Sequence, residues 1–138
     1  MTTRQVRDAL TSRLGTVTGV TTVMPWPGDT QALPAPCITI TQPRHRVDAD
    51  FTVCHALWRR TWTVRIHVHQ TNDQTATIVI DDVVDEVITA LLTDRSLGGT
   101  VTALVIDDVT TPDQPAKGAG APTMVAALTV TTESRQAI

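Results

Sequence analysis

Residues Leu57 to His69 read LWRRTWTVRIHVH, and this stretch decides the fold. Trp58, Trp62 and the aliphatic residues after them occupy every second position, so they share one face of a strand, with Arg, Thr and His on the other. Arg60 interrupts the apolar face near one end. A long strand with one polar face predicts an antiparallel or mixed sheet that helices cover on a single side.

A long amphipathic helix is predicted next, from about Asp73 to Leu92. Thr71 and Gln74 match a capping box, a pattern that begins helices. The apolar stripe at helical spacing comprises Ala76, Ile80, Val83, Val84, Val87, Ile88 and Leu91. The opposite face carries Asp81, Asp82, Asp85 and Glu86. A stripe of this kind is expected to lie on the sheet.

Before the long strand, the sequence predicts a first helix from Thr3 to Leu14, begun by a capping box of Thr2 and Gln5. A short extended piece is expected between Val17 and Met24. Alternation of Ile and Thr then predicts a strand over Cys37 to Gln42. The polar stretch from Arg44 to Val53 has no period, so it is interpreted as a mobile loop or hairpin tip that orders against a partner.

After the long helix, Leu97-Gly98-Gly99 predicts a turn, because glycine adopts positive φ without a steric penalty. A strand from about Thr100 to Val109 follows. Asp107 to Pro122 is rich in Pro and Gly, which indicates a long hairpin connection. The return strand is expected over Thr123 to Glu133, and Ser134 to Ile138 is interpreted as a tail.

These elements predict one α/β domain of the α+β type over residues 1–138, in the order α-β-β-β-α-β-β. The mixed, mainly antiparallel sheet should carry one long and one short helix on one face. Hydrophobic residues make up 41% of the chain and aromatics only 3%, so the core is expected to be aliphatic, with Trp26, Trp58 and Trp62 as its large members. No apolar run approaches the roughly 20 residues of a membrane span, and no secretion signal is present, so a cytoplasmic protein is expected.

Several groups of residues invite a chemical interpretation. His67 and His69 share a strand face and, with Cys54, His55 and His45, could be imagined as zinc ligands, but the spacing is not that of a structural zinc site. The acidic residues of the long helix lie opposite its apolar stripe, where solvent keeps carboxylates ordinary. We therefore interpret the histidine group and the acidic helix residues as solvated surface, and we expect no metal site.

An enzyme is not expected. Cys54 and His55 are neighbours on a strand and would point to opposite faces, and Cys37 and Cys54 are interpreted as reduced, buried thiols. No nucleophile, phosphate-loop or dinucleotide motif occurs, so neither catalytic residues nor cofactors are predicted. The formal charge of -3 argues against a broad grip on nucleic acid, although arginines interleaved with Trp58 and Trp62 leave a small nucleic-acid-binding module open.

The order of elements resembles the tail-terminator, or tail-completion, proteins of long-tailed bacteriophages over nearly the whole chain. The similar features are the opening helix with Val6-Arg7-Asp8-Ala9-Leu10, the segment Pro34-Ala35-Pro36-Cys37-Ile38-Thr39-Ile40, the long strand and long helix, Leu97-Gly98-Gly99-Thr100-Val101 and a final strand pair.

The resemblance implies a virion subunit, assembled in the host cytoplasm, that forms a hexameric ring on the head-proximal end of the tail tube. Such a ring stops tube polymerisation and offers a docking surface, so its partners would be itself, the tail tube protein and a head–tail connector or neck protein. Another head-closure or neck protein is the alternative. Neither a membrane nor a specific nucleic acid is expected as a partner.

Ring and tube contacts are expected on the segment from Arg44 to Val53, on the hairpin from Asp107 to Pro122 and on the polar face of the long strand, because ring subunits use strand edges and protruding loops. The candidate interface residues are Arg44, Arg46, Asp48, Arg59, Arg65, His67, Asp113 and Lys117.

Overall fold

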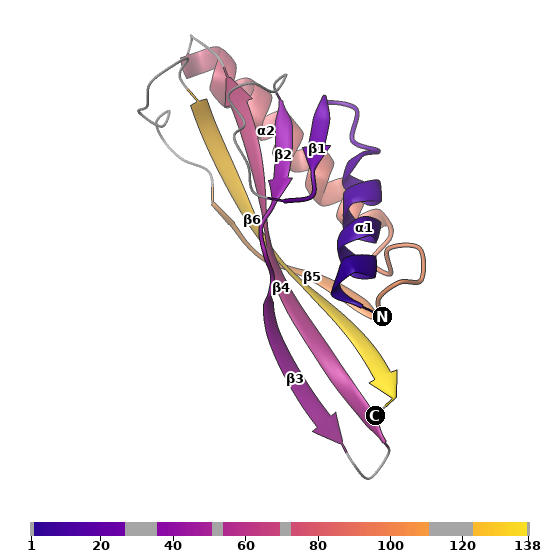
Figure 1. Cartoon of the computed structure of the whole chain (residues 1–138). Helices are drawn as coiled ribbons and strands as arrows, with labels where there is room; N and C mark the ends of the chain where they lie inside the picture. Colours follow the sequence, from indigo (N-terminus) through magenta and orange to yellow (C-terminus); the bar gives the residue numbers. More distant parts are fainter. Residues whose placement is uncertain (1, 27–35, 51–53, 70–72, 111–122, 138) are drawn as a thin grey trace.

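The structure, a computed structural model, describes residues 2–26, 36–50, 54–69, 73–110 and 123–137. Its elements are α1 (Thr3–Leu14), β1 (Thr22–Met24), β2 (Cys37–Ile40), β3 (Arg44–Asp50), β4 (His55–His69), α2 (Asp73–Thr93), β5 (Ala103–Thr110) and β6 (Thr123–Ala137). The strands form one sheet in the order β1-β2-β4-β6-β5, with β3 also paired to β4 (Figure 1). Among the strands that the structure describes, only the β1–β2 pair is parallel. The predicted mixed sheet with two helices is confirmed.

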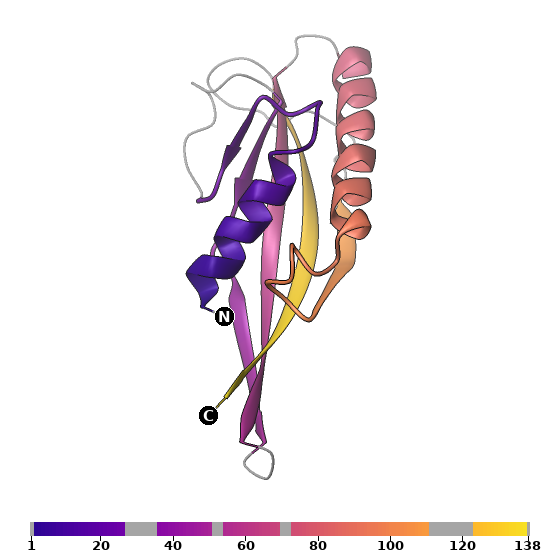
Figure 2. The ribbon, with the colours of Figure 1, turned by 90° about the vertical axis from the view of Figure 1, so that its right-hand side faces the viewer.

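The core lies between the helices and one face of the sheet. On β4, Trp62, Val64, Ile66 and Val68 are all fully buried, as the alternation in the sequence predicts. Both helices cover this face, as Figure 2 shows. The buried stripe of α2 and residues Val6, Leu10 and Leu14 of α1 belong to the same hydrophobic cluster. Burying each of these aliphatic side chains contributes roughly 1.5–3 kcal/mol.

Local signals in the sequence set the helix ends. The Thr2 hydroxyl accepts a hydrogen bond from the Gln5 amide (3.1 Å) and the Gln5 side chain accepts one from the Thr2 amide (2.8 Å), which confirms the first capping box. After α2, Gly98 and Gly99 have φ of 71° and 87°, which confirms the predicted turn. The Asp94 carboxylate accepts hydrogen bonds from the Ser96 hydroxyl and the Gly98 amide, and these bonds lower the pKa of Asp94. The second predicted capping box includes Thr71, which lies outside the described residues.

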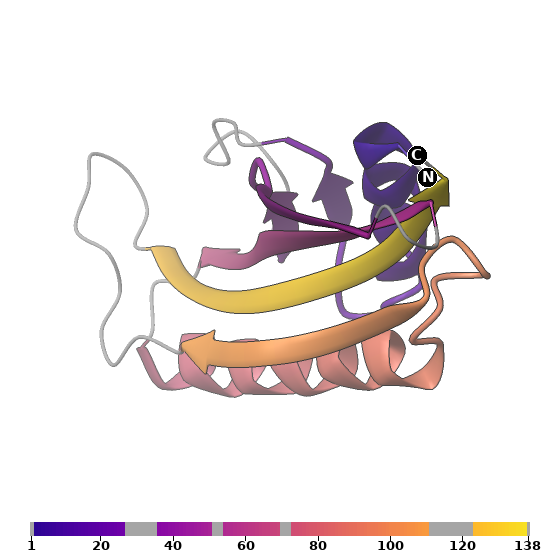
Figure 3. The same cartoon turned by 90° about the horizontal axis from the view of Figure 1, so that it is seen from below.

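A strand-built arm extends beyond the helices. It consists of β3 and the parts of β4 and β6 that pair around it, and Figure 1 shows it projecting past the beginning of α1. Seen from below in Figure 3, β6 and β5 run side by side along α2 before β6 continues toward the arm.

Two predictions for this region are wrong. Arg44–Asp50 is a strand where a loop was expected, and β6 continues to Ala137 through the expected tail. In both segments the backbone pairs with β4 residue by residue, with Arg44 opposite Thr61 and Ser134 opposite Trp58. In Arg44–Asp50 only Val47 and Ala49 are apolar, and the strand is held by backbone pairing, so its sequence pattern is weaker than that of a strand with a covered face.

A one-residue change of register separates β2 from β3. Ile40 lies opposite Val64 of β4, whereas Arg44 lies opposite Thr61, so the segment between them holds one residue more than β4 does. Such an extra residue reverses which alternate positions face each side of a sheet. Even-numbered residues of β2 therefore face the core, whereas Arg44 and Arg46 of β3 face away from the helices.

The large aromatic residues are placed differently from the prediction. Trp62 is fully buried, but Trp26 is 57% exposed, and Trp58 lies on the arm, partly buried and outside the hydrophobic core cluster. The covered part of the sheet is thus filled by aliphatic side chains around a single tryptophan. Within the described residues, neither helix has the length and apolarity needed to cross a membrane.

Candidate assembly surface

Six of the eight predicted interface residues share one surface, the sheet face that points away from the helices, which we call the outer face. In an antiparallel pair, residues opposite each other point to the same side. Arg44 lies opposite Thr61 and Arg46 opposite Arg59, and these β4 positions alternate with the buried Arg60 and Trp62. The same parity places the six described candidates on this face: Arg44, Arg46, Asp48, Arg59, Arg65 and His67. Asp113 and Lys117 lie outside the described residues.

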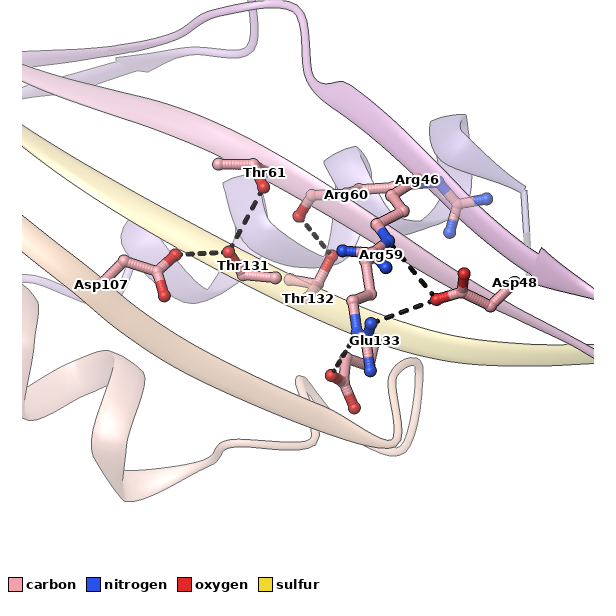
Figure 4. A network of polar contacts seen from close by, with 9 residues as sticks. All are labelled: Arg46, Asp48, Arg59, Arg60, Thr61, Asp107, Thr131, Thr132 and Glu133. Carbon is pink, nitrogen blue, oxygen red and sulfur yellow. Dashed lines mark hydrogen bonds and ion pairs between the residues drawn. The ribbon is translucent and has the colours of Figure 1, made fainter.

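Arg59 is the centre of an ionic cluster on the outer face of the arm (Figure 4). Its Nε donates to Glu133 of β6 at 2.9 Å, and its Nη1 donates to Asp48 of β3 at 3.1 Å. Arg46 also approaches Asp48, at 3.5 Å. The hydrogen bond to Glu133 and the two nearby carboxylates raise the pKa of Arg59 above its ordinary value. The cluster ties the three strands of the arm together across their side chains.

Glu133 was not among the predicted interface residues. Its sequence position, at the expected end of the return strand, gave no sign that it lies opposite Arg59. The only sequence signal for this contact is the charge of Glu133, because a Glu opposite an Arg on a neighbouring strand is a favourable pair. Arg59 and Glu133 are 74 residues apart in the sequence, and only the register of β4 against β6 brings them together.

Polar side chains continue along the outer face toward the covered part of the sheet. The hydroxyls of Thr61 and Thr131 lie 3.3 Å apart, and Thr131 donates to Asp107 (Figure 4). Farther on, His67 Nε2 lies 3.0 Å from the hydroxyl of the buried Thr39. Arg65 between them is exposed, and no ion pair to it is found in the part of the chain that the structure describes.

Arg60 forms the junction between the arm and the core. It is 2% exposed, and it donates to Thr3 of α1 (3.0 Å) and to Ser134 of β6 (2.9 Å). Its guanidinium also lies over the Trp58 ring, 5.0 Å from the centroid. Burial lowers the pKa of Arg60. The hydrogen bonds to Thr3 and Ser134 stabilise its charge, which would otherwise be costly to bury. The interruption of the apolar pattern at residue 60 therefore marks the place where the helical layer ends.

The helix-side face of the arm is partly apolar but carries no helix. Val47 is 45% exposed there, and the rings of His45 and Trp58 meet edge to face at 6.3 Å. The arm therefore exposes both faces along β3, in contrast to the rest of the sheet.

The other predicted chemical groups remain separate. Cys37 is buried, and burial raises the pKa of its thiol, but Cys54 is exposed at a positive φ of 54°, which corrects the expectation that both thiols are buried. The α2 carboxylates are exposed, as predicted. Among the described residues, no three His, Cys, Asp or Glu side chains gather as metal ligands would.

No family model matches the sequence, and no curated protein matches it. Among solved structures, a chain of a structure described as the virion of a native gene transfer agent particle is similar, with 11% sequence identity and a TM-score of 0.47. The match covers 95% of this chain and 90% of that one. A similarity of this size does not carry a function from one protein to the other.

Proposed function

We propose that this chain is a structural virion protein of a long-tailed bacteriophage. It forms a ring that caps the head-proximal end of the tail tube, ends tube polymerisation and provides the surface to which the head or neck attaches. The sequence resemblance to tail-terminator proteins supports this function, and the proposal includes that the chain has no catalytic activity.

The arm is the observation that carries the proposal. Val47 and the other described side chains of β3 are exposed, so the arm gains little from burial within its own chain. Its strands are nevertheless held together by Arg59 and anchored to α1 through Arg60. Among the described strands, β3 pairs only with β4, so its other edge can offer backbone groups to a neighbour. A held, projecting and exposed element is suited to contact with another subunit.

The polar chemistry of the outer face supports a contact role in preference to turnover. Arg59 of the arm pairs across strands with Asp48 and Glu133, and these pairs fix the shape of the arm. Exposed pairs of this kind add little stability, so their use lies in rigidity and in the charge pattern they present.

Tube assembly in the presence of the purified protein tests the proposal. Tail tube protein polymerised with increasing amounts of this chain should give shorter tubes, each with a ring-shaped cap at one end in electron micrographs. The mass of the isolated cap should be that of several copies of the chain. Tubes of unchanged length and ends without added density would contradict the proposal.

Loss of the gene separates this function from that of another head–tail joining protein. A missing tail terminator leads to overlong tails, because nothing stops polymerisation. A missing neck or head-closure protein leaves tails of normal length that are not joined to heads. Tail length in particles from a deletion mutant therefore decides between the two.

A further inference from the structure

The outward side of α2 carries an uncompensated negative charge. Asp81, Asp82, Asp85 and Glu86 are all exposed, and α2 contains no Lys, Arg or His. Glu86 accepts a hydrogen bond from the Gly19 amide, and Arg13 reaches α2 only to donate to the Ala90 carbonyl. Ion pairs to the four carboxylates are absent from the described part of the chain. We call these four residues the acidic helix face.

The outer face of β3 and β4 carries the opposite charge. Four arginines of β3 and β4 lie there, Arg44, Arg46, Arg59 and Arg65, and β6 adds Arg135. The carboxylates described on this face include Asp48, Glu133 and, toward β5, Asp107. Asp48 and Glu133 pair within the ionic cluster around Arg59, and Asp107 accepts a hydrogen bond from Thr131. Arg44 and Arg65 are exposed, and neither has an ion-pair partner among the residues described. We call Arg44 and Arg65 the free arginine pair.

These two surfaces cannot meet within one molecule. The free arginine pair lies on the outer face of the sheet, and the acidic helix face lies beyond the core on the other side of the same sheet. Figure 2 shows α2 beside the strands, on one side of the sheet. Two complementary surfaces on opposite sides of one chain can meet only between copies, in a head-to-tail arrangement that is repeated from each copy to the next.

We propose that copies of this chain associate head to tail, the acidic helix face of one copy lying against the free arginine pair of the next. This inference deepens the proposed function, on which it rests, by assigning the two surfaces that join neighbours in the ring. A contact in which each copy uses two different surfaces closes into a ring when the rotation between copies allows it.

The charges give the contact a dependence on salt. Each copy presents both signs, so attraction acts at every interface, and it is screened beyond about 8 Å at an ionic strength of 0.15 M and about 3 Å at 1 M. The self-association constant should therefore fall as salt rises. Opposed charges at an interface also select the partner, since like charges placed against each other weaken association.

Charge reversal on each surface tests the arrangement. One variant carries Asp81→Lys, Asp82→Lys and Asp85→Lys, which gives the acidic helix face a net positive charge. A second carries Arg44→Glu and Arg65→Glu. Each alone should weaken self-association at least about tenfold, as measured by sedimentation velocity at low salt. An equimolar mixture of the two variants should associate again, because each then finds the opposite charge on its neighbour. A chain carrying all five changes should also associate.

Matched controls separate charge placement from folding. Asp8→Lys and Arg95→Glu alter exposed residues outside both surfaces and should leave self-association unchanged. Circular dichroism and thermal unfolding of every variant check that the chain is folded.

If the full chain associates but the mixture of variants does not, the assigned surfaces are wrong while the proposed function stands. A wild-type chain that stays monomeric at low salt and high concentration, or that uses the free arginine pair to bind DNA instead, also overturns the inference. Failure of the proposed function is read separately, from tail length and tube capping.

Discussion

The two ends of β4 have the same alternating backbone but opposite surroundings. From Trp62 to Val68, every second side chain is fully buried beneath the helices. From His55 to Arg59, the strand runs into the arm, where β3 lies beside it and no helix lies above it. Arg60 stands between these two parts of the strand.

The difference shows how one strand serves two purposes. The covered end has aliphatic side chains that stabilise the fold, whereas the arm end carries Arg59 on its outer face, which pairs with Asp48 of β3 and Glu133 of β6. Stability and interaction are therefore supplied by different ends of the same strand. Substitutions along β4 should have effects that fall steeply on passing Arg60.

The largest effect is expected for Trp62→Ala. The ring is fully buried, its Nε1 donates to the Thr132 hydroxyl at 3.0 Å, and the Arg7 guanidinium lies over it. Loss of a buried tryptophan should lower the free energy of unfolding by roughly 3–5 kcal/mol in urea titrations. On the arm, Val47→Ala should change it by less than about 0.5 kcal/mol. Equal effects at the two sites would refute the division of the sheet.

An intermediate effect is expected for Arg60→Ala at the boundary. The change removes the charge-assisted bonds to Thr3 and Ser134 and the packing of the side chain on Trp58, at a cost of roughly 2 kcal/mol. Arg60→Met keeps an apolar stem of similar length and should recover part of that loss. Denaturant unfolding of both variants measures the difference. A stability of Arg60→Ala equal to wild type would mean that Arg60 does not join the arm to α1.

A smaller effect on stability is expected for Arg59→Ala. Its two ion pairs are exposed, and water and salt screen such pairs. The melting temperature should fall less than for Arg60→Ala, and the difference from wild type should disappear in about 1 M salt. Asp48→Asn, which removes one of the two pairs, provides the matched comparison. A salt-independent loss would show that Arg59 acts through packing.

The smallest perturbation uses the two thiols as reporters of the two environments. Cys54 is exposed just before the arm end of β4, while Cys37 is buried opposite His67 at the covered end. A disulfide reagent reacts with the thiolate form of cysteine. Burial raises the pKa of Cys37, so at pH 8 the Cys37 thiol should be less ionised than an ordinary thiol, and burial also shields it from the reagent. One thiol per native chain should react rapidly, and the second only after unfolding. Rapid reaction of Cys54→Ser with the reagent would contradict this assignment.

The sequence predicted the elements that fill the core more accurately than those of the arm. Capping by Thr2 and Gln5, the stripe of α2 and the alternation in β4 are short-range signals, and α1 has the predicted bounds. The strand at Arg44–Asp50 escaped prediction because its described side chains are exposed and only Val47 and Ala49 in it are apolar. Its existence depends on hydrogen bonds to a partner strand rather than on burial.

The candidate surface shows the same limit. The alternation of β4 alone predicted that Arg59, Arg65 and His67 share a face. That Arg44, Arg46 and Asp48 join them depends on the extra residue between β2 and β3. The roles of Asp113 and Lys117 stay predictions, since these residues lie outside the described part of the chain.

By itself, the sequence determined which residues are buried under the helices, because the hydrophobic effect acts on every apolar side chain at its own periodic position. It also determined the mixed sheet, through one long strand with a polar face. Only the tertiary structure decided the length of the arm, the pairing of Arg59 with Glu133 and the separation of opposite charges onto the two sides of the sheet. Those features depend on register between distant segments, and register is a property of pairs of strands that no single segment specifies.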